Sequence, residues 1–312
     1  MPAVPSPPHD PSHEEHQYLH LIRDILLQGQ HRLDRIGTGT RSILAPPQLH
    51  FSLSKPNPEV GGLIPALPLL TTDQVIPRVV MAEFLWSISA GIKIGDEKWS
   101  RKLLHTIGLG HHEEGNPCPV LGFQWRHFGA RYVDAQTNYT EQGIAQLKDV
   151  VNKLIKNPFN HHIVINSRNS ADRNPVDQRK MALPACHIGA QFYGSFPPGI
   201  NLAEKTKRPT EKGALSCMFY QRSCDIGLDV PPNIASYALL THILAHAADL
   251  QPGKPIHTIG NGYVYLHFAN ALNEQLTREP TEFHKLRIKR NDHGSAVVDG
   301  WKETKNESRA YH

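Results

Sequence analysis

One segment, residues 233–250 (NIASYALLTHILAHAADL), predicts a strong helix that ends near Pro252 and Gly253. Short runs rich in β-branched and aromatic residues surround it and predict strands: HIVINSR, HIGAQFYGSF, LSCMFYQRS, YVYLHF and LRIKR. Strands and helices are mixed here without a regular βαβ alternation. The sequence therefore predicts the α+β fold class.

Three more helices are expected. Residues 74–90 are apolar on most sides, as in a buried helix, with Pro77 in the first turn. Residues 140–155 carry an apolar face, and an N-terminal helix capped by Ser12 should end near Gly29. The run RSILAPPQLHFSL predicts a strand broken at its two prolines, and SKPNPEVGGLIP predicts an exposed loop.

The length of 312 residues, 39% of them hydrophobic, suits one large domain with a proper core. Residues 1–12 are rich in Pro and His and predict a disordered leader. Residues 13–290 hold the predicted elements and form a single domain. Residues 291–312 are polar and without periodicity, so we expect a loosely ordered C-terminal tail.

Charge and cysteine usage limit the partners. The formal charge is +4 with dispersed cations, which argues against nucleic acid and membrane surfaces and favours a small-molecule substrate. No apolar run reaches the roughly 20 residues that span a bilayer. Four cysteines without a C-x-x-C pair predict reduced thiols and a cytoplasmic location.

The stretch LPACHIGAQFYG places Cys186 just before a predicted strand. A cysteine acts as a nucleophile when a nearby cation stabilises its thiolate, and YQRSCD offers Arg222 for this role. An internal cysteine is more often an inert packing residue. Spacing alone leaves both interpretations open.

A resemblance carried by several blocks of the sequence favours the nucleophile over the packing residue as the role of Cys186. They are DRIGTGTRSI, AEFLW, GFQWRHFGARY, MALPACH, QFY, LSCMFYQRSCD, NIASYALLTHILAH, HTIGNGYVY, QLTREP and KLRIKR. In this order the chain resembles the thymidylate synthase family in its eukaryotic form. The resemblance implies a thymidylate synthase-like fold, with a mixed β-sheet, surrounding helices, and a homodimer formed by sheet-to-sheet packing.

In that family a cysteine adds to C6 of a uracil ring, and C5 then attacks a one-carbon unit carried by methylenetetrahydrofolate. By resemblance Cys186 is the nucleophile, Arg222 its cationic partner, and Glu83 a group that handles protons and ordered water. Further positions match the family's substrate-binding residues: Arg35 (phosphate contact), His187, Gln221, Ser223, Asp225, Asn233 and Tyr265. An amide such as that of Asn233 can pair with the O4 and N3–H edge of uracil.

Other positions depart from the family. The arginine pair that a second subunit donates to the substrate phosphate is His161 and His162 here. Because neutral imidazoles replace two fixed cations, we expect nucleotide affinity to fall by orders of magnitude.

The folate side differs as well. The lysine that meets the glutamate tail is Asp73, a glycine of the pocket is Asp229, and a histidine of the family is Tyr263. The chain ends in WKETKNESRAYH, which lacks the family's hydrophobic lid segment.

These departures lead to the main sequence-based hypothesis: a diverged enzyme of specialised metabolism, acting on an electron-poor alkene or heterocycle, without folate-dependent methylation of deoxyuridylate and without a cofactor. Cys186 would add in conjugate fashion, or Asp229, Tyr263, His161 and His162 would supply acid/base chemistry. Two alternatives remain open, an authentic thymidylate synthase that uses methylenetetrahydrofolate and a catalytically inactive dimeric binding protein.

A metal site is not expected. His242 and His246 lie one helical turn apart, but the glutamate of an H-E-x-x-H motif is missing. Core histidines are the ordinary case for such a pair.

Overall fold

The computed structural model describes residues 12–33, 37–59, 61–88, 121–134, 137–170, 186–197, 212–290 and 296–299. The α-helices in these ranges are α1 His16–Gln28, α2 Pro77–Ile88, α4 Leu121–His127, α5 Gln146–Lys156, α6 Val230–Ala247 and α7 Ala269–Gln275. A 3-10 turn, η2, covers Leu266–Phe268. The strands are β1 Gln30–Arg32, β2 Thr40–Leu44, β3 Leu49–His50, β4 Ser54–Pro56, β5 Leu63–Leu67, β6 Val164–Asn166, β7 His187–Ser195, β8 Ala214–Asp225, β9 Gln251–Tyr265, β10 His284–Lys285, β11 Arg287–Arg290 and β12 Ala296–Asp299.

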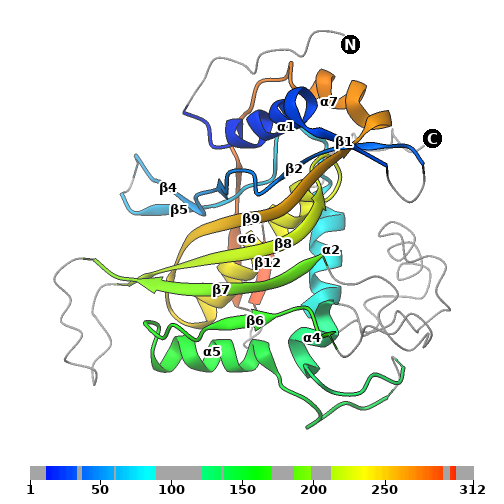
Figure 1. The fold of residues 1–312 in the computed structure, drawn as a ribbon. Coiled ribbons are helices and arrows are strands. Elements are labelled where there is room, and N and C mark those ends of the chain that lie inside the picture. Colours follow the sequence, from blue (N-terminus) through cyan, green and yellow to red (C-terminus); the bar gives the residue numbers. More distant parts are fainter. Residues whose placement is uncertain are drawn as a thin grey trace.

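A seven-stranded sheet is the largest that the described residues form. Its order is β1-β2-β9-β8-β7-β6, with β3 also paired to β9. The long central strands β8 and β9 run parallel, whereas β7 is antiparallel to β8 and β2 is antiparallel to β9. Helix α6 connects β8 to β9 and packs behind them (Figure 1). The predicted α+β class with a mixed sheet is therefore confirmed.

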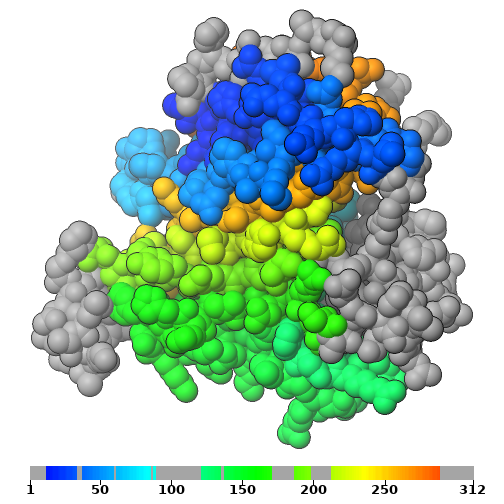
Figure 2. Space-filling model, viewed as in Figure 1, coloured from blue at the N-terminus to red at the C-terminus, as the bar shows by residue number. Residues whose placement is uncertain are grey.

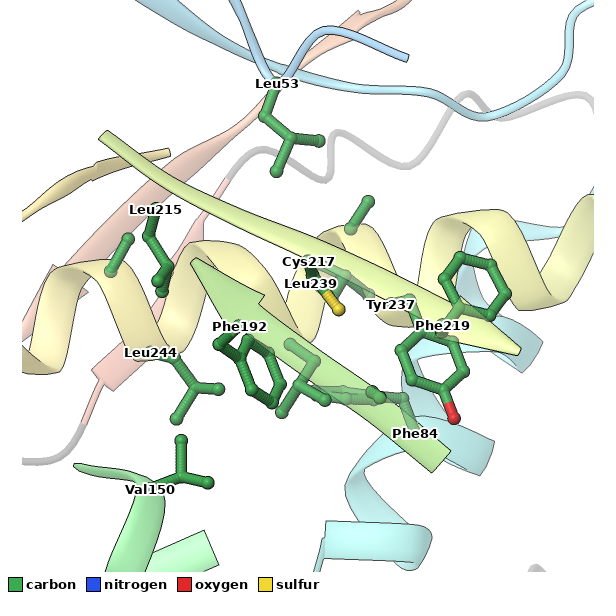
Figure 3. Packing of buried hydrophobic residues seen from close by; sticks show 14 of the residues in the cluster. Leu53, Phe84, Val150, Phe192, Leu215, Cys217, Phe219, Tyr237, Leu239 and Leu244 are labelled. Carbon is green, nitrogen blue, oxygen red and sulfur yellow. The ribbon is translucent and has the colours of Figure 1, made fainter. Parts of the chain in front are cut away.

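The main core lies between this sheet and the helices behind it. Leu215, Cys217 and Phe219 alternate along β8 and are at most 1% exposed, because every second side chain of a strand points to the same face. They pack with residues of α6, including Tyr237, and with Phe84 of α2 (Figure 3). Helix α6 has buried residues along its whole length, as its apolar sequence predicts.

The other face of the sheet has no helix over it in the view of Figure 1. Side chains of β8 and β9 reach the surface there (Figure 2). Three large apolar or aromatic side chains on this side are well exposed: Tyr193 at 60%, Met218 at 39% and Tyr220 at 39%. Several large apolar or aromatic side chains exposed together on one face of a sheet are unusual in a monomeric protein.

A buried carboxylate ties the N-terminal helix to the rest of the fold. Glu15 is 0% exposed, and its side chain accepts hydrogen bonds from the backbone N–H and hydroxyl groups of Thr71 and Thr72 at 2.6–2.8 Å. Four donors compensate the cost of removing the carboxylate from water. The contact fixes the segment that leads into α2, on which Glu83 lies.

The structure differs from the sequence-based expectations at four places. The helix expected over residues 140–155 begins only at Gln146. The run SKPNPEVGGLIP contributes to the β4–β5 hairpin rather than only to a loop, because Gly61 and Gly62 take positive φ angles at its turn. The first helix begins at His16 with Glu15 at its N-cap, not at Ser12. Residues 296–299, within the expected loose tail, form β12 against β11.

Most of the proposed leader, residues 1–11, lies outside the described residues. Among the helices that the structure describes, none combines the length and apolar character needed to cross a membrane.

Candidate active site

Backbone pairing brings Cys186 and Arg222 together. Cys186 directly precedes β7, and its carbonyl oxygen accepts a hydrogen bond from the backbone N–H of Arg222 on β8 at 2.9 Å. From there the Arg222 guanidinium reaches back, so that Nη2 lies 3.8 Å from Sγ of Cys186. The contact that the sequence suggested is present in the fold.

Two opposing effects act on the Cys186 thiol. Burial raises its pKa most strongly, the Arg222 guanidinium lowers it, and the carboxylate of Asp229 raises it again. The net shift of the pKa is upward. Arg222 thus partly offsets the cost of forming a thiolate in a partly buried site.

Three carboxyl groups of this region interact with one another, and one of them, Asp229, also acts on the thiol. Asp229 is the N-cap residue of α6 and keeps surface exposed to solvent, yet partial burial of its carboxyl group raises its pKa. Burial also raises the pKa of Glu83 on α2, and the charge of Asp229 adds to that effect. Since Asp229 acts on both Glu83 and Cys186, these groups form one electrostatic cluster.

Asp225, at the end of β8, is the third carboxyl group and is 4% exposed. Its Oδ1 accepts hydrogen bonds from the backbone N–H groups of Gly227 (2.9 Å) and Leu228 (3.1 Å). Its Oδ2 is buried and has no hydrogen-bond partner among the described residues. Burial raises the pKa of Asp225 to about 6, although the two backbone donors oppose the shift.

His187 and Gln221 lie beside the nucleophile and contact each other. Nε2 of His187 is 3.3 Å from the side-chain amide nitrogen of Gln221. Nδ1 of the same ring is 3.1 Å from the hydroxyl oxygen of Tyr237. Burial lowers the pKa of His187 to about 4, so the ring is neutral near pH 7.

The remaining candidates of the chain's C-terminal half converge on the same end of the sheet. Parallel pairing sets Ser223 beside Asn261 and Asp225 beside Tyr263, and the ring centroids of Tyr263 and Tyr265 are 5.4 Å apart. Burial raises the pKa of Tyr263, and the charge of Asp229 contributes.

Asn233 lies in the first turn of α6, where its backbone N–H donates to the carbonyl oxygen of Asp229. Asn233 therefore lies at the same N-terminal end of α6 as the carboxyl group of Asp229.

His161 and His162 lie apart from this cluster. Both are exposed in the turn before β6, where the neighbouring Ile163 accepts a hydrogen bond from Phe192 of β7. Phe192 is six residues beyond Cys186, which is about 20 Å along a strand. Within one chain the two histidines therefore do not join the Cys186 site, and Arg35 lies outside the described residues.

Sequence reasoning missed three residues that contact the site from behind. The hydroxyl of Tyr237 contacts His187, the ring of Trp125 packs edge-on against Tyr237, and Trp125 donates a hydrogen bond to Ser167. The available signal was a tyrosine inside the otherwise apolar run of α6, since a buried tyrosine hydroxyl needs a partner.

Among the described residues, no group of three or more His, Cys, Asp or Glu side chains is arranged to hold a metal ion. Nε2 of His242 instead donates to the carbonyl oxygen of Ala66 at 2.9 Å, as a core histidine does.

Comparison with known proteins now identifies the family. The thymidylate synthase family model matches residues 16–306. The chain belongs to the thymidylate synthase family. It is 46% identical over 292 residues to the thymidylate synthase of Candida albicans, with 89% of this chain and 88% of that protein covered.

Two further thymidylate synthases have similar coverage. The enzyme of Saccharomyces cerevisiae is 46% identical over 288 residues, covering 89% of this chain and 88% of that protein. The enzyme of Agaricus bisporus is 42% identical over 307 residues, covering 93% and 96%.

These comparisons contradict the main functional hypothesis drawn from the sequence. Relatives named thymidylate synthase match about nine-tenths of the chain at 42–46% identity, which favours the alternative of an authentic thymidylate synthase. The expectation of a diverged enzyme for an electron-poor alkene or heterocycle was therefore wrong. It gave a few substituted positions more weight than the whole-chain similarity.

The contact between Arg222 and Cys186 is testable without substrate. Replacing Arg222 by Gln removes the cation that opposes the burial effect, so the pKa of Cys186 rises further and less thiolate is present at pH 7.5. We expect alkylation of Cys186 by iodoacetamide, followed by peptide mass spectrometry, to slow by about tenfold or more. Arg278→Gln, which removes a solvent-exposed arginine, is the matched control and should leave the rate unchanged. An equal rate in Arg222→Gln and the parent would contradict this account.

Proposed function

We propose that this protein is a thymidylate synthase, which methylates deoxyuridylate at C5 with methylenetetrahydrofolate as the one-carbon donor. The observation that carries the proposal is the 3.8 Å contact between Sγ of Cys186 and Nη2 of Arg222, at the position of the family's nucleophile. The names of the fungal relatives support the same reaction.

In this proposal Cys186 begins the reaction as a thiolate. Its sulfur forms a bond to C6 of the uracil ring, and the electron pair of the C5–C6 double bond moves to C5 and onto O4. C5 then gains its new carbon and loses its proton, and the bond from that carbon to its donor nitrogen breaks to leave an exocyclic methylene on the ring. Hydride addition converts this methylene to a methyl group as the S–C6 bond breaks and returns the thiolate. Arg222 stabilises that thiolate before and after the cycle.

Glu83 is suited to moving the protons of this cycle. Its raised pKa keeps a proton on the carboxyl group at a higher pH than an exposed glutamate would. A protonated Glu83 can donate toward O4 as negative charge develops there, and the carboxylate can accept a proton on the way back. Asn233 would pair with the O4 and N3–H edge of the ring and orient it.

The folate cofactor fits one feature of the structure. The buried Oδ2 of Asp225 lacks a partner among the described residues, and a carboxylate accepts well from the N–H groups that line the pterin ring edge. Methylenetetrahydrofolate would supply both the carbon and the hydride, because a methylene unit is two electrons more oxidised than a methyl group. Asp225 is the residue that would hold it.

A homodimer is part of the proposal. The exposed sheet face with Tyr193, Met218 and Tyr220 is continuous with the strands that carry the site. Packing two such faces would remove this apolar surface from water. It would also give His161 and His162 of one copy access to the phosphate bound by the other, although an imidazole binds phosphate less tightly than the bidentate guanidinium of an arginine.

Turnover tests the proposed reaction. The purified protein, mixed with deoxyuridylate at millimolar concentration and methylenetetrahydrofolate, should form thymidylate and dihydrofolate in equal amounts, measured by chromatography and absorbance. Cys186→Ala should reduce product to the level without enzyme. Cys217→Ala removes a core thiol that is 0% exposed and should retain turnover. Absence of thymidylate with the folded parent protein would refute the proposal and leave a binding protein as the alternative.

Light scattering coupled to gel filtration tests the dimer. The parent should elute at twice the mass of its 34.9 kDa chain. Tyr220→Glu places a charge in the proposed interface and should shift the protein to monomer. Leu63→Glu, at a position 50% exposed on the β4–β5 hairpin, is the matched control and should remain dimeric. A monomeric parent would overturn this part of the proposal.

A further inference from the structure

Strand β9 passes unusually close to the backbone of Arg222. Gly260 of β9 lies opposite Arg222, between two regular pairs of the parallel β8–β9 ladder. A β-carbon built on Gly260 would lie 2.6 Å from the carbonyl oxygen of Arg222 and 3.1 Å from its carbonyl carbon. Because β-carbons almost never approach another heavy atom within 3.0 Å, a side chain at this position would push one of the two strands aside.

The space above Gly260 is filled as well. The hydroxyl oxygen of Tyr220 would lie 2.9 Å from the same β-carbon. Tyr220 and Arg222 are two residues apart on β8, so their side chains leave the sheet on the same face. A tyrosine side chain can turn aside, whereas the carbonyl group of Arg222 belongs to the strand itself. The carbonyl group is therefore the obstacle that a side chain at residue 260 cannot avoid.

Strand β9 is also held from its other edge. The carbonyl oxygen of Gly260 accepts a hydrogen bond from the backbone N–H of Ala45, and the regular β2–β9 pairing begins at the adjacent residues. Ala45 has a φ angle of 50°, in the left-handed region that a non-glycine residue seldom occupies. A residue kept in such a conformation is fixed by its surroundings. Strand β9 therefore cannot retreat from Arg222 without breaking this pairing.

Arg222 carries any such shift to the nucleophile. Its backbone N–H donates to the carbonyl oxygen of Cys186 at 2.9 Å, and its Nη2 lies 3.8 Å from Sγ of Cys186. Cys186 precedes the first residue of β7, and the β7–β8 pairing is irregular between His187 and Gly189. This end of the ladder has fewer regular pairs to resist a displacement than its middle. A moved Arg222 would thus change the distance from guanidinium to thiol, on which the stabilisation of the thiolate depends.

We propose that Gly260 is a positioning residue, whose missing side chain allows Arg222 to lie where its guanidinium reaches the thiol of Cys186. Gly260 acts through the backbone of Arg222 and not through a contact of its own with a substrate. The effect on turnover rests on the proposed thymidylate synthase reaction. The effect on the reactivity of the thiol does not, because it can be measured without substrate.

The test is Gly260→Ala. Alkylation of Cys186 by iodoacetamide is followed by peptide mass spectrometry from about pH 6 to about pH 10, since the rate rises with the thiolate fraction. A displaced guanidinium stabilises the thiolate less, so the midpoint of this profile should move to higher pH. We expect the rate at pH 7.5 to fall about threefold or more, and kcat for thymidylate formation to fall with it.

Gly253→Ala is the matched control. A β-carbon on Gly253 would lie 2.6 Å from Oγ of Ser216 and 2.8 Å from the carbonyl oxygen of Leu215, so β9 is crowded against β8 at this position too. Gly253 is seven residues before Gly260, which is about 23 Å along a strand. The substitution should lower the melting temperature, as Gly260→Ala does, but leave the alkylation profile of Cys186 unchanged.

A second variant serves if Gly260→Ala folds poorly. Tyr220→Phe removes the hydroxyl group over Gly260, so that the double variant Tyr220→Phe, Gly260→Ala meets only the carbonyl group of Arg222. Relative to Tyr220→Phe, the double variant should show the same upward shift of the alkylation profile.

An unchanged profile in either folded Gly260 variant, or an equal shift in Gly253→Ala, would overturn the inference. So would failure of both Gly260 variants to fold, because Gly260 would then serve the fold rather than the thiol. If the parent forms no thymidylate, the profiles still decide the inference, while the proposed reaction fails separately.

Discussion

The backbone hydrogen bond between the N–H of Arg222 and the carbonyl oxygen of Cys186 sets the geometry of the whole site. It continues the ladder between β7 and β8 past the last regular pair, His187 with Gln221. The distance between thiol and guanidinium is therefore fixed by sheet register rather than by flexible side chains. Strand β8 is in turn held between β7 and β9 and backed by α6, so the core determines where the reactive pair lies.

Electrostatics in this site is a balance of opposing effects. Burial and Asp229 disfavour the thiolate of Cys186, and Arg222 favours it. Burial keeps Glu83 and Asp225 protonated to a higher pH than exposed carboxyl groups, and the negative charge of Asp229 adds to the effect. Carboxyl groups with raised pKa values can donate a proton and take it back near neutral pH. This property suits a reaction in which protons are moved to and from several atoms of one ring.

Much of the fold follows from sequence patterns, because those patterns reflect burial. The apolar run of α6 and the alternation in β8 predicted elements that the structure contains, and Pro77 begins α2 as a proline at a helix start can. The β4–β5 hairpin was missed since its turn glycines and prolines resemble those of a loop. Strand β12 was missed because its short sequence, AVVD, lies within an otherwise polar segment and pairs with β11 only in the folded chain.

The site was predictable only in part. Cys186 and Arg222 stood out by resemblance, and register explains why they meet. Ser167 and Trp125 carried no local signal, since their hydrogen bond and the contact of Trp125 with Tyr237 appear only when α4 and the end of β6 pack against α6. The functional hypothesis failed for a different reason: it read His161, His162 and Asp229 one by one, whereas similarity over about nine-tenths of the chain reflects the whole framework around Cys186.

The most direct test of the central claim is covalent capture by 5-fluorodeoxyuridylate in the presence of methylenetetrahydrofolate. Fluorine at C5 cannot leave as a proton does, so a thiol that has added to C6 remains attached. Mass spectrometry of the intact protein should show one added nucleotide and one added folate per site, and the digest should place both on the peptide that contains Cys186. An unmodified protein, or an adduct on Cys118, Cys217 or Cys224, would contradict the assignment of Cys186 as the nucleophile of a thymidylate synthase.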